Sequence, residues 1–376
     1  MLSPISESLV PFGLEDFFDE FEHRPEFINL ASSDALPWTS ADLRGKGISM
    51  EEIVDITMGY PDAKRCMLPG LKKFCKPPAG IGLLPTSGAA EAIALVMHEF
   101  SARSLRGNRV VGIPWPAYGA YRGLAALLGL QIETYEYQPS RHWTAVPDEV
   151  VALSERCGAL IVTNPHNPTG QVMPLDMLAH LSRELSSHGG ILIVDEVFNV
   201  SGKTESAISL GPEVAVIGSM SKTYGLPGLR LGWLAANEER LARIRTIQQY
   251  LTLTLSAMTV TLGAAILEKP AQFSREELIR ENRHILCDWA KAQSGVMEIS
   301  APHGGTTVCL TVETSLDEKE LFERFLKERV LLAPGIRCFD CQHRVPWFRL
   351  GYGTQSQALR QGLERVSAVV NRLANQ

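Results

Sequence analysis

The sequence lacks a surplus of basic residues, since 36 Lys and Arg stand against 42 Asp and Glu, a formal net charge of −6. A nucleic-acid-binding surface needs a clustered basic surplus, so this composition argues against one. Cysteines are also few, and the odd number of seven does not describe a secreted disulfide framework. Residues 1–21 carry acids and no apolar core, unlike a signal or transit peptide. We therefore expect a cytoplasmic protein with reduced thiols.

Long stretches without charge are scarce too, with one exception. Residues 246–267 contain no charged side chain over a length that could span a bilayer. Gln248, Gln249 and several Thr and Ser residues make this a poor transmembrane helix. We expect a segment that is buried inside the fold or in a subunit interface. Cys338 and Cys341 form a CxxC pair, but no second pair completes a zinc site, and no metal is expected.

The middle of the chain alternates short apolar runs with helical periodicity. A length of 376 residues is two to three average domain lengths. The pattern predicts helices over residues 88–101, 118–128, 148–157 and 174–187, and strands over 109–113, 130–137, 159–163, 191–194 and 214–218. Such alternation is typical of a mostly parallel sheet covered on both faces. A second α/β unit is expected beyond residue 275, with helices over 275–293, 317–328 and after 355, and a strand over 306–312.

Ligands of such sheets bind outside the carboxyl ends of the strands, so binding and catalytic residues are expected in the segments that follow the strands. Lys222 lies in SMSKTYGLPGLRLGW, after the expected strand 214–218. An amine withdrawn from water among apolar and glycine residues is a nucleophile for a carbonyl carbon. Ser219, Ser221 and Arg230 belong to the same segment and suit a phosphate.

A second phosphate contact is expected at PTSGAAEAI, residues 85–93, where small residues lead into a helix. The exposed N–H groups of Gly88, Ala89 and Ala90 would form an anion cradle at that helix N-terminus. Asp195 ends the buried run ILIVD, where an ionisable group is costly unless it is paired. It is a candidate partner for a pyridinium nitrogen.

Three further residues in these segments have side chains suited to binding. Asn167, in NPHNPTG, offers an amide to a ring oxygen, and Tyr118 offers a flat face for stacking. Arg349, in WFRLGYG, is a candidate bidentate clamp for a substrate carboxylate.

Together and in this order the motifs resemble the class I and II aminotransferase-like family, the fold-type I enzymes that use pyridoxal 5′-phosphate (PLP). The resemblance implies the PLP-dependent transferase fold type I, an α/β fold with seven mostly parallel strands in a large domain. It also implies a small domain built from both chain ends. We assign residues 1–45 to an N-terminal arm and part of the small domain, 46–270 to the large domain, and 271–376 to the small domain.

The same resemblance assigns roles to the candidate residues. Lys222 would link covalently to PLP, Asp195 would face the pyridine nitrogen, and Asn167 the ring oxygen. Tyr118 would stack on the ring and Arg349 would bind substrate. Phosphate contacts would come from the small residues and the arginine, namely Gly88, Ala89, Ala90, Ser219, Ser221 and Arg230. Tyr60, in MGYP, resembles the tyrosine that reaches a phosphate across the interface of a homodimer with shared active sites.

One departure bears on the reaction. Phe198 stands three positions after Asp195, where many transaminases have a tyrosine that donates to the ring oxygen. Phe198, the N-terminal LED-aromatic segment and the QYLTLTLS run resemble the capreomycidine-synthase group, which eliminates a hydroxyl from hydroxylated arginine and closes a ring; enduracididine formation is related. A guanidinium substrate needs carboxylates near the pocket, and the acidic N-terminal arm supplies them. We expect substrate contacts from Glu15 and Asp34.

Three functions are therefore compared. The favoured one is dehydration and cyclisation of a hydroxylated, arginine-like amino acid. The alternative is an aminotransferase that uses 2-oxoglutarate or another keto acid as amino acceptor. A PLP-binding regulator without turnover is the third, and it is disfavoured because Lys222, Asp195 and Arg349 are all present.

Overall fold

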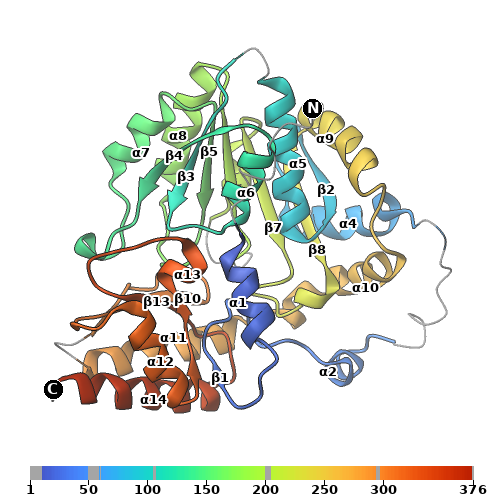
Figure 1. The fold of residues 1–376 in the computed structure, drawn as a ribbon. Helices are drawn as coiled ribbons and strands as arrows, with labels where there is room; N and C mark the ends of the chain where they lie inside the picture. The colour runs from blue at the N-terminus through green and yellow to red at the C-terminus, as the bar shows by residue number, and fades with distance from the viewer. Residues whose placement is uncertain are drawn as a thin grey trace, which may run out of the picture.

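The computed structural model describes residues 11–49, 59, 61–104, 107–199, 205–293 and 297–374. A seven-stranded sheet forms its centre (Figure 1). The strands follow the order β2-β8-β7-β6-β5-β3-β4 across the sheet. β8 runs antiparallel to both of its neighbours and the other pairs are parallel, which confirms the mostly parallel sheet. Their bounds are β2 Ile81–Ser87, β3 Val110–Trp115, β4 Gln131–Glu136, β5 Ala159–Thr163, β6 Ile191–Asp195, β7 Val214–Ser219 and β8 Leu231–Asn237.

Alternate side chains of the central strands enter two different cores. Ile161 and Ile193 face a core under α5 (Gly88–Arg103), whereas Leu160 and Leu192 face the core under α8 (Leu175–Ser187). Both faces of β5, β6 and β7 are therefore covered by helices, and every residue of these strands is buried. The remaining helices of this layer are α4 Ala63–Cys75, α6 Ala120–Leu127, α7 Pro147–Ser154, α9 Glu238–Leu251 and α10 Ala257–Glu268.

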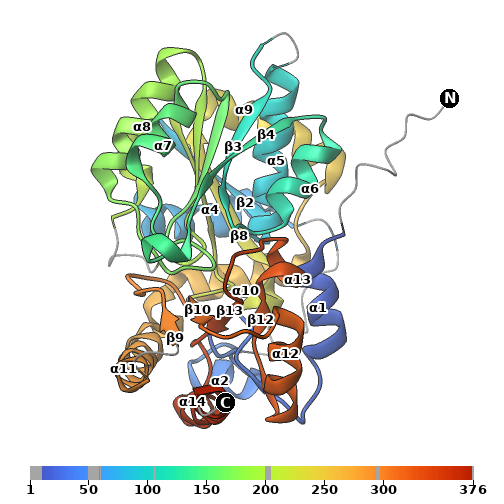
Figure 2. The same ribbon diagram turned by 60° about the vertical axis from the view of Figure 1, so that its left-hand side comes forward.

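A smaller α/β unit lies at one end of the large sheet (Figures 1 and 2). Its antiparallel sheet has the order β12-β13-β10-β9, with β9 Met297–Ile299, β10 Thr307–Val312, β12 Ala333–Pro334 and β13 Trp347–Gly351. A parallel pair, β1 (Ile28–Asn29) with β11 (Val330–Leu331), joins the N-terminal segment to it. The helices are α1 Gly13–Phe21, α2 Ser40–Gly45, α11 Glu276–Ala292, α12 Glu318–Lys327, α13 Gly335–Phe339 and α14 Ser356–Ala374. Short 3-10 helices occupy Pro139–Arg141, Ala207–Leu210, Pro227–Leu229 and Pro270–Phe273.

The charge-free run 246–267 holds the end of α9 and most of α10. Ile266 and Leu267 are buried, as expected, but four large apolar side chains nearer its start are exposed: Tyr250 at 87%, Leu251 at 51%, Leu253 at 56% and Met258 at 44%. Burial inside this chain thus fails for these four side chains, although Leu255 between them is buried, and the other expectation, a subunit interface, stays a prediction for them. Within the described ranges, no helix is both long and apolar enough to cross a membrane.

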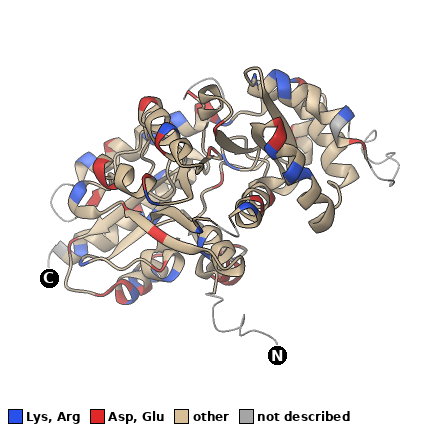
Figure 3. Ribbon diagram, turned by 90° about the horizontal axis from the view of Figure 1, so that it is seen from above, with Lys and Arg blue, Asp and Glu red and all other residues tan. Residues whose placement is uncertain are grey.

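Acidic and basic residues are interspersed along the ribbon of the described elements (Figure 3). No single basic stripe runs along the elements drawn there, in keeping with the small negative net charge.

Candidate active site

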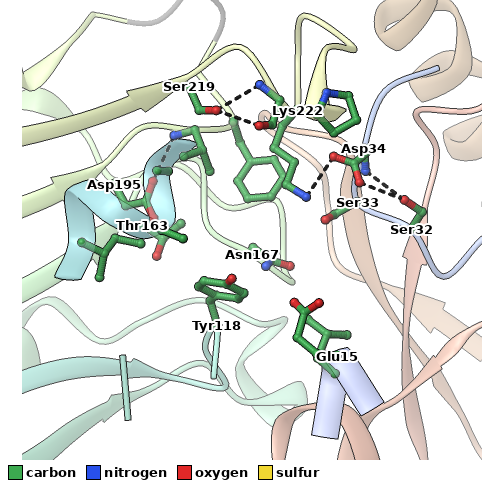
Figure 4. A pocket seen from close by; sticks show the side chains of 18 of the residues that line it. Glu15, Ser32, Ser33, Asp34, Tyr118, Thr163, Asn167, Asp195, Ser219 and Lys222 are labelled. Carbon is green, nitrogen blue, oxygen red and sulfur yellow. Dashed lines mark hydrogen bonds and ion pairs between the residues drawn. The ribbon is translucent and has the colours of Figure 1, made fainter. Parts of the chain in front are cut away.

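A cavity of about 580 Å³ lies where the carboxyl ends of the parallel strands meet the smaller unit. It brings together predicted residues from distant parts of the chain (Figure 4). Those that line it are Glu15, Asp34, Ala89, Ala90, Tyr118, Asn167, Asp195, Phe198, Ser219, Ser221, Lys222, Arg230 and Arg349. Tyr60 lies outside the described residues.

Lys222 follows β7 and extends its amine into the cavity (Figure 4). Its Nζ lies 3.0 Å from Oδ1 of Asp34, and both side chains are about three-quarters buried. The backbone N–H of Ala35 donates to the carbonyl oxygen of Lys222 at 3.1 Å. The N-terminal segment is therefore fastened to the lysine loop through both main chain and side chain.

The expected phosphate cradle is assembled from β2, α5 and the lysine loop. Gly88 opens α5 with φ +77°, and a Cβ there would come within 2.3 Å of Nη2 of Arg230. Glycine therefore lets the guanidinium of Arg230 rest directly on the helix N-terminus. Ser219 Oγ donates to Ser221 Oγ at 2.9 Å, so both hydroxyls lie on the same side of the cavity. Backbone N–H groups, hydroxyls and one fixed cation converge here, which is the donor set of an anion site.

Asp195 ends β6 as a buried carboxyl at the inner wall of the cavity. Its Oδ2 accepts from the hydroxyl of Tyr121 at 2.7 Å, and its Oδ1 accepts from the backbone N–H of Val197 at 3.1 Å. Burial raises the pKa of Asp195 to about 6, although these donors and Lys222 oppose the shift. A buried carboxylate of this kind gains from a cationic nitrogen placed against it.

The sequence reasoning missed Tyr121 and Thr163. The Tyr121 hydroxyl bridges Asp195 and Thr163, whose Oγ1 lies 2.9 Å away. Helical spacing gave no signal for Tyr121, because Tyr118 precedes α6 whereas Tyr121 lies in the first turn of that helix.

Asn167 and Arg349 meet at the boundary between the two sheets. Nη1 of Arg349 donates to Oδ1 of Asn167 at 3.3 Å, which orients the amide so that its N–H₂ group is left for the cavity. Nε and Nη2 of Arg349 donate to the carbonyl oxygen of Ala31 at 3.1 and 2.7 Å. Complete burial lowers the pKa of Arg349 to about 10, so the guanidinium stays charged near neutral pH.

Aromatic residues form the cavity wall next to Arg349 and Asp195. Tyr118 lies with its ring centroid 5.3 Å from that of Phe12 and 5.9 Å from that of Tyr121. Burial raises the pKa of Tyr118 to about 12, so its hydroxyl is neutral. Phe198 is buried and brings no hydroxyl to the wall.

Three carboxylates line the cavity on the side of the N-terminal segment: Glu15 in the first turn of α1, Glu22 at the C-terminal end of that helix, and Asp34 beyond β1. Partial burial raises the pKa of Glu15, and the charges of Lys222 and Arg349 oppose that rise. The other acids of the arm do not line the cavity: Asp16 and Asp19 face solvent, and Glu20 pairs with Arg337. Of the acidic residues in the N-terminal arm, only some therefore line the cavity.

The donor set of this cavity, a lysine amine, a buried carboxylate and an anion cradle, is the one that PLP requires. The family model for aminotransferases of class I and II matches residues 79–366. The chain belongs to this family. Its members and structural neighbours use PLP, and the chain is a PLP-dependent enzyme with this fold.

Individual relatives cover nearly the same span. The chain is 30% identical over 303 residues to capreomycidine synthase from Streptomyces vinaceus, over 78% of this chain and 75% of that one. A PLP-dependent aminotransferase from Streptococcus suis superposes with a TM-score of 0.85 at 23% identity, over 97% of this chain and 98% of that one. The PLP-dependent cyclase OrfR gives 0.81 at 23% identity, over 96% and 97%. The two structures establish the fold.

Proposed function

We propose that this enzyme removes water from a hydroxylated, arginine-like amino acid and allows the side-chain guanidine to close a ring. The observation that carries the proposal is the set of three carboxylates, Glu15, Glu22 and Asp34, that line the PLP cavity. The 30% identity to a capreomycidine synthase supports it.

Charge balance in the cavity favours a cationic side chain. Arg230 is committed to the phosphate, Arg349 to the α-carboxylate of the substrate, and Lys222 to the cofactor. The cavity lining then offers no further Lys or Arg among the described residues to pair with Glu15 and Glu22. A guanidinium is the group that two such carboxylates bind by charge-assisted hydrogen bonds.

The residues around PLP each have a stated task in this proposal. Bound PLP withdraws electrons from the α-carbon of an amino acid and so makes the α-proton acidic. Lys222 would accept that proton at Nζ, and Asp195 would keep the pyridine nitrogen protonated. Asn167 would donate its amide N–H to the ring oxygen, and Tyr118 would stack on the ring. The phosphate would be held by Gly88, Ala89, Ala90, Ser219, Ser221 and Arg230.

Phe198 bears on the choice of reaction. A buried phenyl ring at this position supplies no second donor to the ring oxygen, which leaves that task to Asn167. The ring oxygen would then accept one hydrogen bond fewer than in relatives with tyrosine, and it is the resemblance to the capreomycidine-synthase group at this position that favours dehydration.

The product of a hydroxyarginine tests the proposal. Purified holoenzyme is incubated with β-hydroxyarginine, with and without 2-oxoglutarate, and the products are separated by mass spectrometry. We expect loss of one water and no keto acid in either mixture. A keto acid that forms only when 2-oxoglutarate is present would instead establish the alternative, a conventional aminotransferase, which the complete set of cofactor-binding residues also permits.

A homodimer with shared active sites is part of the proposal. Tyr250, Leu251, Leu253 and Met258 expose apolar side chains close together in sequence, and Leu253 holds a left-handed backbone (φ +63°). An exposed apolar group on a strained backbone is the mark of a binding surface, and a second copy of the chain is the partner we assign to it.

Leu253→Asp is expected to convert the dimer to a monomer, because it places a charge in an apolar interface. Light scattering after size exclusion at micromolar concentration measures the mass. Leu127→Asp is the matched control, since Leu127 is equally exposed at 56% but lies on α6. A wild-type mass of one chain, or an unchanged dimer in Leu253→Asp, would contradict the assignment.

Tyr121→Phe is expected to weaken PLP binding about tenfold or more, the size of a hydrogen bond to a charged group. Without the phenolic donor the pKa of Asp195 rises further and its carboxylate pairs less well with the pyridine nitrogen. Absorbance titration of apoenzyme with PLP gives the Kd. Tyr135→Phe controls for loss of a buried hydroxyl, because Tyr135 donates to the carbonyl of Ile161 at 3.1 Å, away from the cavity lining. Equal Kd values in both variants would refute the role of Tyr121.

A further inference from the structure

Asp34 occupies a rigid segment between the catalytic lysine and the substrate clamp. The carbonyl of Ala31 accepts from Arg349, the carbonyl of Ser33 accepts from Thr306 Oγ1 at 2.6 Å, and the N–H of Ala35 donates to Lys222. Gly353 permits this approach, since a Cβ there would lie 2.4 Å from the carbonyl oxygen of Asp34. These contacts hold the backbone of the segment in place, and the carboxylate itself accepts from Ser32 Oγ at 3.4 Å and pairs with Lys222.

Asp34 differs from Glu15 and Glu22 in what it touches. It forms an ion pair with Nζ of Lys222 at 3.0 Å, whereas Glu15 acts on Lys222 and Arg349 through its charge alone. With the α-carboxylate of a substrate on Arg349 and its α-proton facing Lys222, the α-carbon lies between these two cations. Asp34 is therefore the carboxylate beside the α- and β-carbons, whereas Glu15 approaches the cavity from α1 on its other side (Figure 4).

We propose that Asp34 binds the β-hydroxyl of the substrate and holds it against the amine of Lys222, an inference that rests on the proposed dehydration. The Asp34 carboxylate accepts hydrogen bonds from the substrate hydroxyl and from the lysine ammonium. The hydroxyl oxygen is then kept within reach of an Nζ–H, in the position where a leaving group has to be protonated.

The proton and the electrons balance without another reactant. Lys222 takes the α-proton, and the electron pair of that C–H bond becomes the second bond between the α- and β-carbons. The bond between the β-carbon and oxygen breaks, and its electron pair leaves with the oxygen. Nζ returns the proton to that oxygen, so that water departs and the amine is neutral again. Asp34 is unchanged and selects hydroxylated substrates.

Binding of the β-hydroxyl by Asp34 can be distinguished from support of Lys222 by two reactions of the same variant, α-proton exchange and dehydration. Holoenzyme is incubated in D₂O with arginine, and exchange of the α-proton is followed by NMR; water loss from β-hydroxyarginine is followed by mass spectrometry. Asp34→Ala is expected to retain exchange within about threefold and to slow dehydration by about 10²-fold or more. Asp34→Asn keeps an oxygen acceptor and is expected to lie between Asp34→Ala and wild type. Asp16→Asn, a neutralised exposed acid of the same arm, is the control.

The absorbance of the lysine-linked chromophore adds a reading that does not depend on turnover. Asp34 pairs with Nζ of Lys222 but is not the covalent partner of PLP, so Asp34→Ala should keep the lysine-linked absorbance band. Loss of that band would show that Asp34 only supports Lys222 and would overturn the inference.

Each remaining outcome decides the proposal. Exchange and dehydration that fall together would show that Asp34 only positions Lys222, and dehydration equal to wild type would show that it does not bind the hydroxyl; either overturns the inference and leaves the proposed function intact. Wild-type enzyme that releases no water contradicts the proposed function itself, and the step assigned to Asp34 is then wrong with it.

Discussion

Lys222→Ala is expected to abolish the lysine-linked chromophore of the holoenzyme and to reduce turnover by about 10³-fold or more. The amine is the covalent partner of PLP in the proposed function, and it also accepts the α-proton. Methyl in place of the butylammonium chain removes both functions at once. The absorbance spectrum of the purified variant with added PLP measures the first effect, and product formation from β-hydroxyarginine measures the second.

Lys269→Ala serves as the control for that experiment, because Lys269 caps α10 and does not line the cavity. Its spectrum and turnover are expected to match wild type. A Lys222→Ala protein that keeps the wild-type spectrum would refute the covalent assignment. One that loses the chromophore but retains full turnover would refute its role in proton transfer.

Asp195→Asn is expected to have opposite effects on cofactor binding and on the stability of the apoenzyme. Burial raises the pKa of Asp195 from 3.8 to about 6, so its ionised form is disfavoured in the folded, cofactor-free protein. The cost of that ionisation is absent below about pH 4 and grows as the pH rises towards 6. Above pH 6 it amounts to about 2–3 kcal/mol of folding free energy.

A neutral amide has no such cost, so Asp195→Asn apoenzyme should unfold at higher denaturant concentration than wild type at pH 8, and the difference should vanish near pH 4. The same variant lacks the anion that pairs with the pyridine nitrogen, and its Kd for PLP should rise by about 10²-fold or more. Urea unfolding at the two pH values and absorbance titration with PLP check both halves. A variant that binds PLP as tightly as wild type would contradict the pairing of Asp195 with the cofactor.

The local pattern of apolar residues predicts the strands of the large sheet and the residues that follow them. The strand ILIVD and its neighbours are recognisable because a short apolar run bounded by turns is typical of a strand that is buried on both faces of a sheet. Once that sheet is assumed, Asp195, Asn167 and Lys222 must meet, since each follows a strand at the same edge. Their convergence in one cavity needs no information beyond strand order.

Contacts between distant parts of the chain are not readable in this way. The ion pair of Asp34 with Lys222 joins the segment after β1 to the loop after β7, and no periodicity in the sequence relates the two positions. The carbonyl of Ala31 as acceptor for Arg349 is a main-chain contact that any residue type could supply. The hydrogen bond from the hydroxyl of Tyr121 to Asp195 joins α6 to the end of β6, 74 positions apart in the chain. These contacts depend on how the two units dock, which is why sequence reasoning missed their geometry.

The exposed start of the charge-free run 246–267 is a second feature that the sequence does not predict. Lack of charge indicates that a segment avoids water, but it does not tell which surface covers it. The structure leaves Tyr250 and Leu253 exposed on a single chain, and we propose that a second copy of the chain covers them.

The central claim is tested most directly by the absorbance spectrum of the holoenzyme before and after it converts a stoichiometric amount of β-hydroxyarginine, with no keto acid present. Dehydration and ring closure do not transfer the amino group to the cofactor. We therefore predict that the lysine-linked spectrum returns completely. Accumulation of the pyridoxamine form with release of a keto acid would contradict the account and establish an aminotransferase.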